Sequence, residues 1–494
     1  MSWPTRNSAA LGRAVAAARL SPAVVLAGAL AACTTVGPNF QRPAAPAAGG
    51  YAMAGDKVAP IAVLTPDQRA AGPWWQAMGD AQLNEVMTLA LANNQTVAEA
   101  DANLAKARDQ AAGVAGSLKP QVDAKGSAQR ERINIQSFGF TGFPNPTLNL
   151  YSVGGDVSYD LDLFGGGRRS VEAARARVDL QGERADAAYL SLTGNVAMQA
   201  LRIAMVREQI VTVNAIIADD QRNIDIVRKA EAAGGEPASA TVGGRAQLAS
   251  DMAQLPPLNQ QLAEARHALA ALVGRSPAEW SAPDFTLTGF SIPASVPVSL
   301  PSELVRRRPD ILAAEADLHA ATAGIGVATA KLYPDVRLTA DLTLTALSPE
   351  KMFSWNSTGY SLGAGVTAPI FHGGTLKADK RAAEDEARAS MARYRQTVLT
   401  AFTQVSDVLS ALANDDERLK AVALSQSAAE ANLKDARSSY TLGGGPFVDV
   451  VTAQRRLNTV RRDYVDAEAQ RLSDIVKLFT ATAADWRTEQ SASR

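Results

Sequence analysis

The sequence is poor in the residues on which metal and thiol chemistry depend. Its 494 residues include one cysteine and three histidines, which excludes an intrachain disulfide and a thiolate metal cluster. Lys+Arg of 49 nearly balance Asp+Glu of 50, so the chain has no electrostatic footprint for nucleic acid. No Gly-rich phosphate loop, His-Glu-x-x-His or Gly-x-Ser-x-Gly motif occurs. We therefore expect no cofactor, no metal, no nucleic-acid partner and no enzymatic activity.

Residues 1–32 have the pattern of an export signal peptide. Three arginines precede a short apolar stretch that ends in Leu-Ala-Ala-Cys33, and no acidic residue occurs before this cysteine. The string has the form of a bacterial lipobox, so Cys33 is predicted to carry a covalent lipid. Thr34 follows, rather than the aspartate that retains many lipoproteins at the inner membrane, which favours the outer membrane. The alternative is that Cys33 is a small buried hydrophobe after an ordinary signal peptide.

The remaining chain divides by composition and period. Residues 33–79 are rich in Ala, Pro and Gly, which is typical of an extended tether. Repeat 1 is predicted to include short helices, a hairpin and two long helices, at 80–275 overall, 121–160 for the hairpin, and 168–233 and 238–274 for the long helices. A Pro-rich connector follows at 276–306. Repeat 2 is predicted at 307–486, with a helix, a hairpin at 335–371, long helices at 375–442 and 447–482, and a tail at 487–494.

The two repeats are defined by matching residues at fixed offsets. At an offset of 214, the first copy's Leu104, Leu118, Pro120 and Val122 match Leu318, Leu332, Pro334 and Val336. At an offset of 209, a second set matches without a gap: Arg228, Gly234, Gly235, Pro237, Val242 and Leu248 with Arg437, Gly443, Gly444, Pro446, Val451 and Leu457. Agreement at so many punctuating residues indicates a duplicated unit of helix, hairpin, long helix, tip and helix.

The hairpins have the period and length of membrane strands. After Pro334, apolar Val336, Leu338, Ala340, Leu342 and Leu344 alternate with polar residues, and the segment after Pro120 alternates in the same way. Exposed-looking aromatics, such as Phe353 and Trp355, follow in the loops. Alternating strands of about 9 to 11 residues with aromatics near their ends have the dimensions of an outer-membrane barrel.

The long helices carry a heptad pattern. No proline occurs within 168–233, and neither proline nor glycine within 375–442, so each helix can run for roughly 100 Å at 1.5 Å per residue. Apolar residues of the first follow a four-three spacing that is interrupted only by Gln199 and Asp220: Leu192, Val196, Ile203, Val206, Ile210, Val213, Ile217, Ile224 and Val227. Such a repeat predicts a left-handed coiled coil. The alternative, core helices of a large globular domain, would have shorter helices and broader apolar faces.

Strands and helices together predict an oligomeric membrane protein. One chain supplies four membrane-length strands, whereas a closed barrel needs at least eight so that no backbone edge faces lipid. Two chains would fill their own lumen with side chains, while three would give 12 strands and an aqueous bore. The predicted fold class is therefore an α+β membrane protein, with a helical coiled-coil tunnel and a β-barrel that is completed by trimerisation.

Several motifs, in this order, resemble a known family. They are Cys33 to Pro43 (CTTVGPNFQRP), Trp74-Trp75, Leu161 to Gly165 (LDLFG), Arg307 to Ile311 (RRPDI), and Tyr440-x-x-Gly443 with Val448-Asp449-Val450. The chain resembles the outer-membrane channel lipoproteins of tripartite efflux pumps, the TolC and OprM superfamily (NodT branch). This resemblance implies a homotrimer in outer-membrane lipid, with a periplasmic adaptor (membrane fusion protein) and an RND-type inner-membrane transporter as partners.

Two glycine-rich tips join the long helices. Gly234-Gly235-Glu-Pro237 and Gly443-Gly444-Gly445-Pro446 reverse the chain, since glycine supplies a left-handed helix end and proline suits the first turn of the next helix. A sharp turn alone accounts for these residues. The resemblance further implies that the tip glycines, Gly234, Gly235, Gly443 and Gly444, dock onto the adaptor.

The segment after the second tip matches the family's periplasmic constriction. The resemblance places Asp449 and Arg455 at a gate, where relatives use acids and interhelical pairs. Thr452 departs from the family, whose members commonly have an acid there, so a trimer would carry three like charges instead of six. The alternative is that Asp449 is only a favourable charge near a helix N-terminus.

These observations favour a passive exit duct for small molecules or drugs over an enzyme. The second hypothesis is a coiled-coil surface or periplasmic lipoprotein without a pore, acting as a scaffold or adhesin. Membrane-length hairpins argue against it, because a scaffold has no need of them.

Overall fold

The computed structural model describes residues 35–45, 50, 51, 53, 64–66, 73–139, 142, 144–291, 296–298 and 301–483. Cys33, the predicted signal peptide and the predicted tail lie outside the described residues. The chain groups into two compact units that cut across the sequence repeats. Unit 1 holds the described residues within Met1–Arg42, Lys106–Asp179 and Ala316–Ala392, and unit 2 holds those within Pro43–Ala105, Leu180–Glu315 and Arg393–Arg494.

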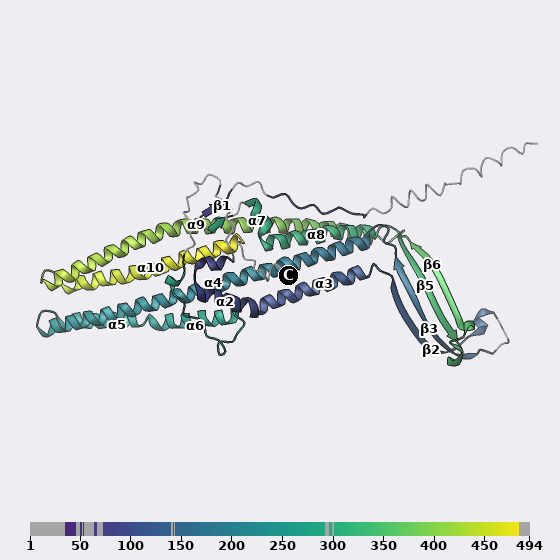
Figure 1. The fold of residues 1–494 in the computed structure, drawn as a ribbon, viewed down its shortest axis with the longest axis horizontal. Helices are drawn as coiled ribbons and strands as arrows, with labels where there is room; N and C mark the ends of the chain where they lie inside the picture. Colours follow the sequence, from purple (N-terminus) through teal and green to yellow (C-terminus); the bar gives the residue numbers. More distant parts are fainter. Residues whose placement is uncertain are drawn as a thin grey trace, which may run out of the picture. The chain divides into compact units, whose positions relative to one another are not determined.

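The element order shows the duplication (Figure 1). The helices are α2 (Ala81–Asn93), α3 (Gln95–Gly116), α4 (Gly166–Ala232), α5 (Ala238–Met252), α6 (Leu255–Leu272), α7 (Pro301–Arg307), α8 (Pro309–Ala330), α9 (Thr375–Thr441) and α10 (Phe447–Ala481). The strands are β1 (Leu64–Pro66), β2 (Gln121–Arg132), β3 (Thr147–Asp160), β4 (Val296–Val298), β5 (Asp335–Ala346) and β6 (Thr358–Thr367). Helices α3 and α8 both have 22 residues, and α4 and α9 both have 67. These helices therefore match in length between the two copies, as the sequences do.

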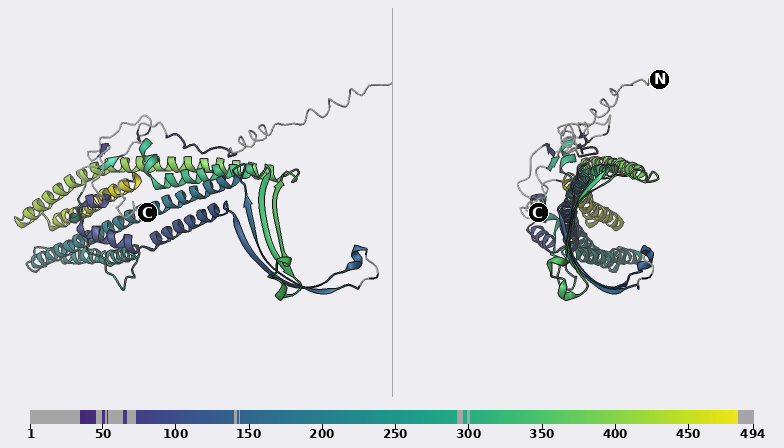
Figure 2. Two further views of the ribbon diagram at one scale, coloured as in Figure 1. Left: turned by 45° about the vertical axis from the view of Figure 1, so that its right-hand side comes forward. Right: turned by 90° about the vertical axis from the view of Figure 1, so that its right-hand side faces the viewer.

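Unit 1 contains one antiparallel sheet in the order β2-β3-β5-β6. Its register aligns Val122 with Val157, Val157 with Ala340, and Leu338 with Ala364. Directly opposed residues point to the same face of a sheet, so the alternating apolar side chains of all four strands share one face. Figure 2 shows the strands curving together.

The other face of this sheet is polar. Asp123 lies opposite Asp156, and Asp156 lies opposite Asp341. Lys125 forms an ion pair with Asp156 across β2 and β3 (2.6 Å). On the apolar face, Leu362 is 79% exposed. The apolar face thus has no cover within the described part of the chain, which is the pattern of a strand layer between lipid and an aqueous lumen.

Unit 2 is held together by an apolar core around the tryptophan pair. Trp74 is fully buried and stacks on Phe479 of α10, with ring centroids 5.2 Å apart. Asp80 caps the start of helix α2, because its carboxylate accepts a hydrogen bond from the backbone N–H of Leu83 (2.8 Å). Core residues from α2, α4, α6, α9 and α10 surround this contact.

The coiled-coil pattern is present, with a small drift from the predicted stripe. In α4 the buried positions follow three-four spacing over Val213, Ile216, Asp220, Asn223 and Val227. The sequence predicts Ile217 and Ile224 in this stripe, and the structure leaves both only partly buried. In unit 2, α9 runs beside α10, and α4 beside α5 (Figure 1). Near the tips, both hairpins contribute to one apolar cluster that includes Val227, Ala429, Leu433, Phe447 and Leu457.

One predicted helix is wrong in its continuity. The sequence predicts a single helix over 238–274, but the structure divides it into α5 and α6 at Ala253 and Gln254. Pro256 and Pro257 explain the break, since neither has an N–H to donate four residues back and each ring crowds the carbonyl there. The corresponding α10 has no proline and continues for 35 residues.

Helix α8 is the one described helix that is long and apolar enough to cross a membrane, judged by length and composition alone. Its most apolar 18-residue window has a mean hydropathy of 1.2, and 44% of this window is buried inside the protein. Buried core helices share these properties, and Ile311 of α8 is fully buried.

Candidate functional site

Both tips end their first helix with the same hydrogen-bond pattern. The N–H of Gly235 donates to the carbonyl of Ala230 (2.9 Å), and the N–H of Gly234 donates to that of Glu231 (2.9 Å). At the second tip, Gly444 and Gly443 donate to Ser439 and Tyr440 in the same way (2.9 and 3.0 Å). Each is a Schellman motif, in which the C′ residue is left-handed.

The four tip glycines are not equivalent. Gly234 and Gly443 have φ values of 78° and 76°, in the left-handed region that favours glycine. Gly235 and Gly444 have ordinary backbone angles, and an added Cβ would meet neighbouring atoms no closer than 3.5 Å. The turn therefore requires glycine at Gly234 and Gly443 but not at Gly235 or Gly444.

The predicted gate residues lie on an exposed face of α10. Asp449 is in the first turn of this helix, and its backbone N–H donates to the carbonyl of Pro446 (3.2 Å). The exposed residues that follow it have three-four spacing and polar side chains, namely Thr452, Arg456, Thr459 and Asp463. This polar stripe points away from the apolar seam of α10.

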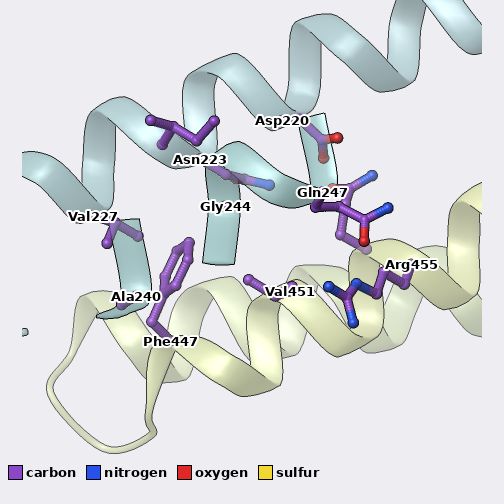
Figure 3. A pocket seen from close by; sticks show the side chains of 11 residues that line it. Asp220, Asn223, Val227, Ala240, Gly244, Gln247, Phe447, Val451 and Arg455 are labelled. Carbon is purple, nitrogen blue, oxygen red and sulfur yellow. The ribbon is translucent and has the colours of Figure 1, made fainter. Parts of the chain in front are cut away.

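Arg455 lies next to a narrow cavity between the hairpins. The cavity has a volume of about 20 Å³, which is room for one water molecule. Figure 3 shows it lined by Asp220, Gln247, Phe447 and Arg455, which come from α4, α5 and α10. Burial and neighbouring acids raise the pKa of Asp220, and the Arg455 charge offsets a part of this rise. Asp220 is thus the acidic group on α4 toward which Arg455 acts.

Asp220 is buried beside a second carboxyl group. Burial raises its pKa to about 7, and the approach of Asp251 and the charge of Asp219 act in the same direction. Asp220 is 7% exposed and Asp251 is 5% exposed. Sequence reasoning did not recognise this pair as a site, although it found Asp220 as an interruption of the apolar stripe.

Gln454 joins three helices by hydrogen bonds. Its side-chain oxygen accepts from Arg437 of α9 (2.8 Å), and its amide donates to Asn458 of α10 (2.9 Å) and to Asp219 of α4 (3.4 Å). Gln454 is 2% exposed. The two hairpins are therefore connected by a buried polar network as well as by apolar contacts, and no pattern in the sequence indicates this network.

The chain just after Cys33 is fixed to unit 1. The N–H of Val36 donates to the carbonyl of Phe164 (3.1 Å), and the Arg169 guanidinium donates to the Val36 carbonyl (3.1 Å) and to Asn39 Oδ1 (2.6 Å). Phe164 lies four residues after the end of β3, so this part of the tether is held at the end of a strand. Among the described residues, no group of three His, Cys, Asp or Glu side chains could hold a metal ion.

Comparison with known proteins agrees with these features. The sequence matches the model of the outer membrane efflux protein family over residues 86–275 and 300–484. It is 30% identical to the pyoverdine export outer membrane protein OpmQ of Pseudomonas aeruginosa over 84% of this chain and 88% of that protein. It is 27% identical to the "Probable outer membrane lipoprotein SilC" of Salmonella typhimurium over 92% of this chain and 96% of that protein.

The fold also resembles solved outer-membrane channels. The structure of the outer-membrane channel OprN matches with a TM-score of 0.82 at 28% sequence identity, covering 92% of this chain and 100% of that one. The predicted fold class and the outer-membrane location are confirmed by these likenesses. The chain belongs to the outer membrane efflux protein family and is the outer-membrane channel of an efflux system.

Proposed function

We propose that three copies of the chain form one 12-stranded barrel, which serves as the passive exit duct of a tripartite pump with a periplasmic adaptor and an RND-type inner-membrane transporter. The single observation that carries the trimer is the four-stranded sheet of unit 1. Within this sheet β2 and β6 pair on one side only. In lipid, the unpaired N–H and C=O groups of both edges would cost several kcal/mol each.

Three copies satisfy these edges with the smallest barrel that leaves a wide bore. The β6 edge of one copy would pair with the β2 edge of the next, and closure after three sheets removes every edge. The apolar face with Leu362 would then contact lipid, and the face with Asp156 would line the lumen. The duct needs no catalytic group, because the inner-membrane transporter supplies the energy.

Two measurements test the trimer and the duct. The purified protein should run as a trimer on gels without heating, and it should conduct ions in planar bilayers. A monomer with no conductance at any voltage would overturn the proposal and favour a coiled-coil scaffold without a pore.

We further propose that Cys33 carries the lipid anchor. Cys33→Ala should lose the lipid and still form trimers, because barrel insertion depends on the strands and the tether keeps its contacts through Val36 and Arg169. Metabolic labelling with palmitate, followed by gel analysis of trimers, measures both effects. Label that persists in the variant would show that Cys33 does not carry the lipid.

The tip glycines are proposed to dock onto the adaptor. Gly234→Val with Gly443→Val should weaken adaptor crosslinking and efflux while trimers persist, since each valine strains a left-handed residue by about 1–2 kcal/mol and adds bulk. Gly443→Asn separates the effect of bulk from the effect of backbone strain, because asparagine tolerates this backbone. If close approach matters, Gly443→Asn and Gly444→Ala also weaken crosslinking. Unchanged crosslinking and drug accumulation in the double valine variant would contradict docking.

Asp449 is proposed to line the pore, with Arg455 holding the closed state. Three converging carboxylates attract cations, so Asp449→Ala should lower cation selectivity with little change in trimer stability. Arg455→Ala should loosen the closed state, because it removes the cation that acts on Asp220 across the hairpins. Bilayer recordings at low salt, where screening is weakest, measure both.

Asp435→Ala, which removes an exposed acid from α9, is the control. Selectivity and conductance equal to wild type in Asp449→Ala would leave this residue as an ordinary helix-start charge.

A further inference from the structure

Each coiled-coil hairpin contains one buried pair of carboxyl groups. The first acid pair joins Asp220 of α4 and Asp251 of α5, and the second joins Asp415 of α9 and Asp474 of α10. These four residues are 7%, 5%, 8% and 3% exposed. Buried carboxylates are costly unless each finds a hydrogen-bond donor or a positive charge.

The two pairs have the same local geometry. Asp251 accepts hydrogen bonds from Gln247 and Gln254 (2.8 and 2.6 Å), which lie four residues before it and three residues after it. Asp474 accepts from residues at the same two positions, Gln470 and Lys477 (2.8 and 2.7 Å). Each pair thus has one carboxyl whose donors lie within four residues of it in the sequence.

The other member of each pair is unsatisfied. Asp220 Oδ2 and Asp415 Oδ2 are buried and receive no hydrogen bond from an N–H or O–H donor of the described chain. A side-chain hydrogen bond with the partner carboxyl, Asp251 or Asp474, is among the causes that raise the pKa of each. Two carboxyl groups can bond to each other only when one of them holds a proton, so a shared proton completes each pair.

The duplicated sequence shows that the fold does not need these acids. At the offset of 209 residues, as from Gly234 to Gly443, the positions equivalent to the first acid pair are Ala429 and Val460, and those equivalent to the second are Val206 and Ala265. All four equivalents are at most 6% exposed. Each hairpin therefore has a carboxyl layer where the other hairpin has an apolar layer.

The charges around the pairs only partly offset burial. Around the first pair, Asp219 of α4 raises the pKa of Asp220 and Arg455 of α10 lowers it, while Arg462 of α10 bonds to Gln254. Desolvation is the largest effect, and the pKa of Asp220 is about 7. Around the second pair, Arg418 of α9 and Lys477 of α10 lower the pKa of Asp415, which burial and Asp474 raise to about 6. Asp416 of α9 is neutralised by Arg471 of α10 (2.6 Å).

We propose that the two acid pairs are proton-binding sites that hold the hairpins packed when a proton is shared and loosen them when it leaves. The effect on conduction rests on the proposed function as a duct, whereas proton binding by the hairpins does not. The first pair also connects to the candidate gate, because Arg455 acts on Asp220.

The sign follows from the raised pKa values. A packed hairpin holds its proton up to about pH 6 or 7, whereas a loosened carboxyl releases it near 3.8. The stabilisation is complete below the loosened pKa and is lost as pH rises through the packed pKa. Across this window each pair should raise the loosening equilibrium by up to about tenfold per pH unit.

The test replaces each pair by the other hairpin's own residues. Asp220→Ala with Asp251→Val copies the second repeat, and Asp415→Val with Asp474→Ala copies the first. Hydrogen exchange of α4, α5, α9 and α10 in the trimer, corrected for intrinsic rates, is measured from about pH 5 to about pH 9, together with single-channel conductance. Asp225→Asn is the matched control, since Asp225 lies on α4, has a 61% exposed side chain and pairs with Arg228.

Wild type and Asp225→Asn should lose protection as pH rises, up to about pH 6 in α9 and α10 and up to about pH 7 in α4 and α5, and conductance should rise over the same range. Each double variant should lose this dependence in its own hairpin only. Should a double variant not assemble, Asp220→Asn and Asp415→Asn should hold protection constant, because a neutral amide replaces the protonated acid. Equal pH profiles in wild type and variants would overturn the proton sites while leaving the duct intact. If the variants lose the pH dependence of exchange but the wild-type protein never conducts, only the duct is overturned.

Discussion

The need to pair every backbone edge in lipid is the constraint on which the rest of the structure depends. A sheet of four strands has two edges, at β2 and β6, and one apolar face without cover in the described chain. This chain alone cannot pair either edge in lipid, so we propose that copies of the chain pair edge to edge, while the apolar face contacts lipid. The same strands set the place of other parts. Helix α4 begins six residues after β3 ends, and Asp162 fixes this corner by accepting from the N–H groups of Gly167 and Arg168 (2.8 and 2.9 Å).

Features set by local sequence could be predicted. Strand period, absence of proline and matching repeats located all four long strands and both 67-residue helices to within a few residues. The Asp80 cap of α2 is local in the same sense, because it joins two residues three apart in the sequence. The continuous helix over 238–274 was wrong, since Pro256 and Pro257 interrupt it. A proline pair acts on the carbonyls of the preceding turn, which is where α5 ends.

The candidate site was only partly predictable. Glycine at a helix end signals a left-handed residue, but the sequence does not separate Gly234, which the turn requires, from Gly235, which it does not. The sequence shows a polar residue in the apolar stripe of α4 at Asp220. In α9, Asp415 likewise interrupts the apolar spacing between Leu412 and Leu419. The sequence does not identify Asp251 and Asp474 as the partners of these two acids, because the pairing depends on the register of one helix against another. The bonds of Gln454 depend on the packing of three helices in the same way.

The buried acids make sense as a compromise between sealing and opening. Apolar layers such as Ala429 with Val460 show that this sequence can pack the same position without a titratable group, so carboxyl layers weaken the hairpins wherever their protons are lost. The two layers are staggered: Asp220 precedes its tip glycine by 14 residues and Asp415 precedes its own by 28. A difference of 14 residues is two heptads, which keeps both acids on the seam of their coiled coils. Each hairpin can therefore be loosened at one layer while the apolar layer at the same height of its neighbour stays packed, which lets the tunnel wall yield locally without coming apart.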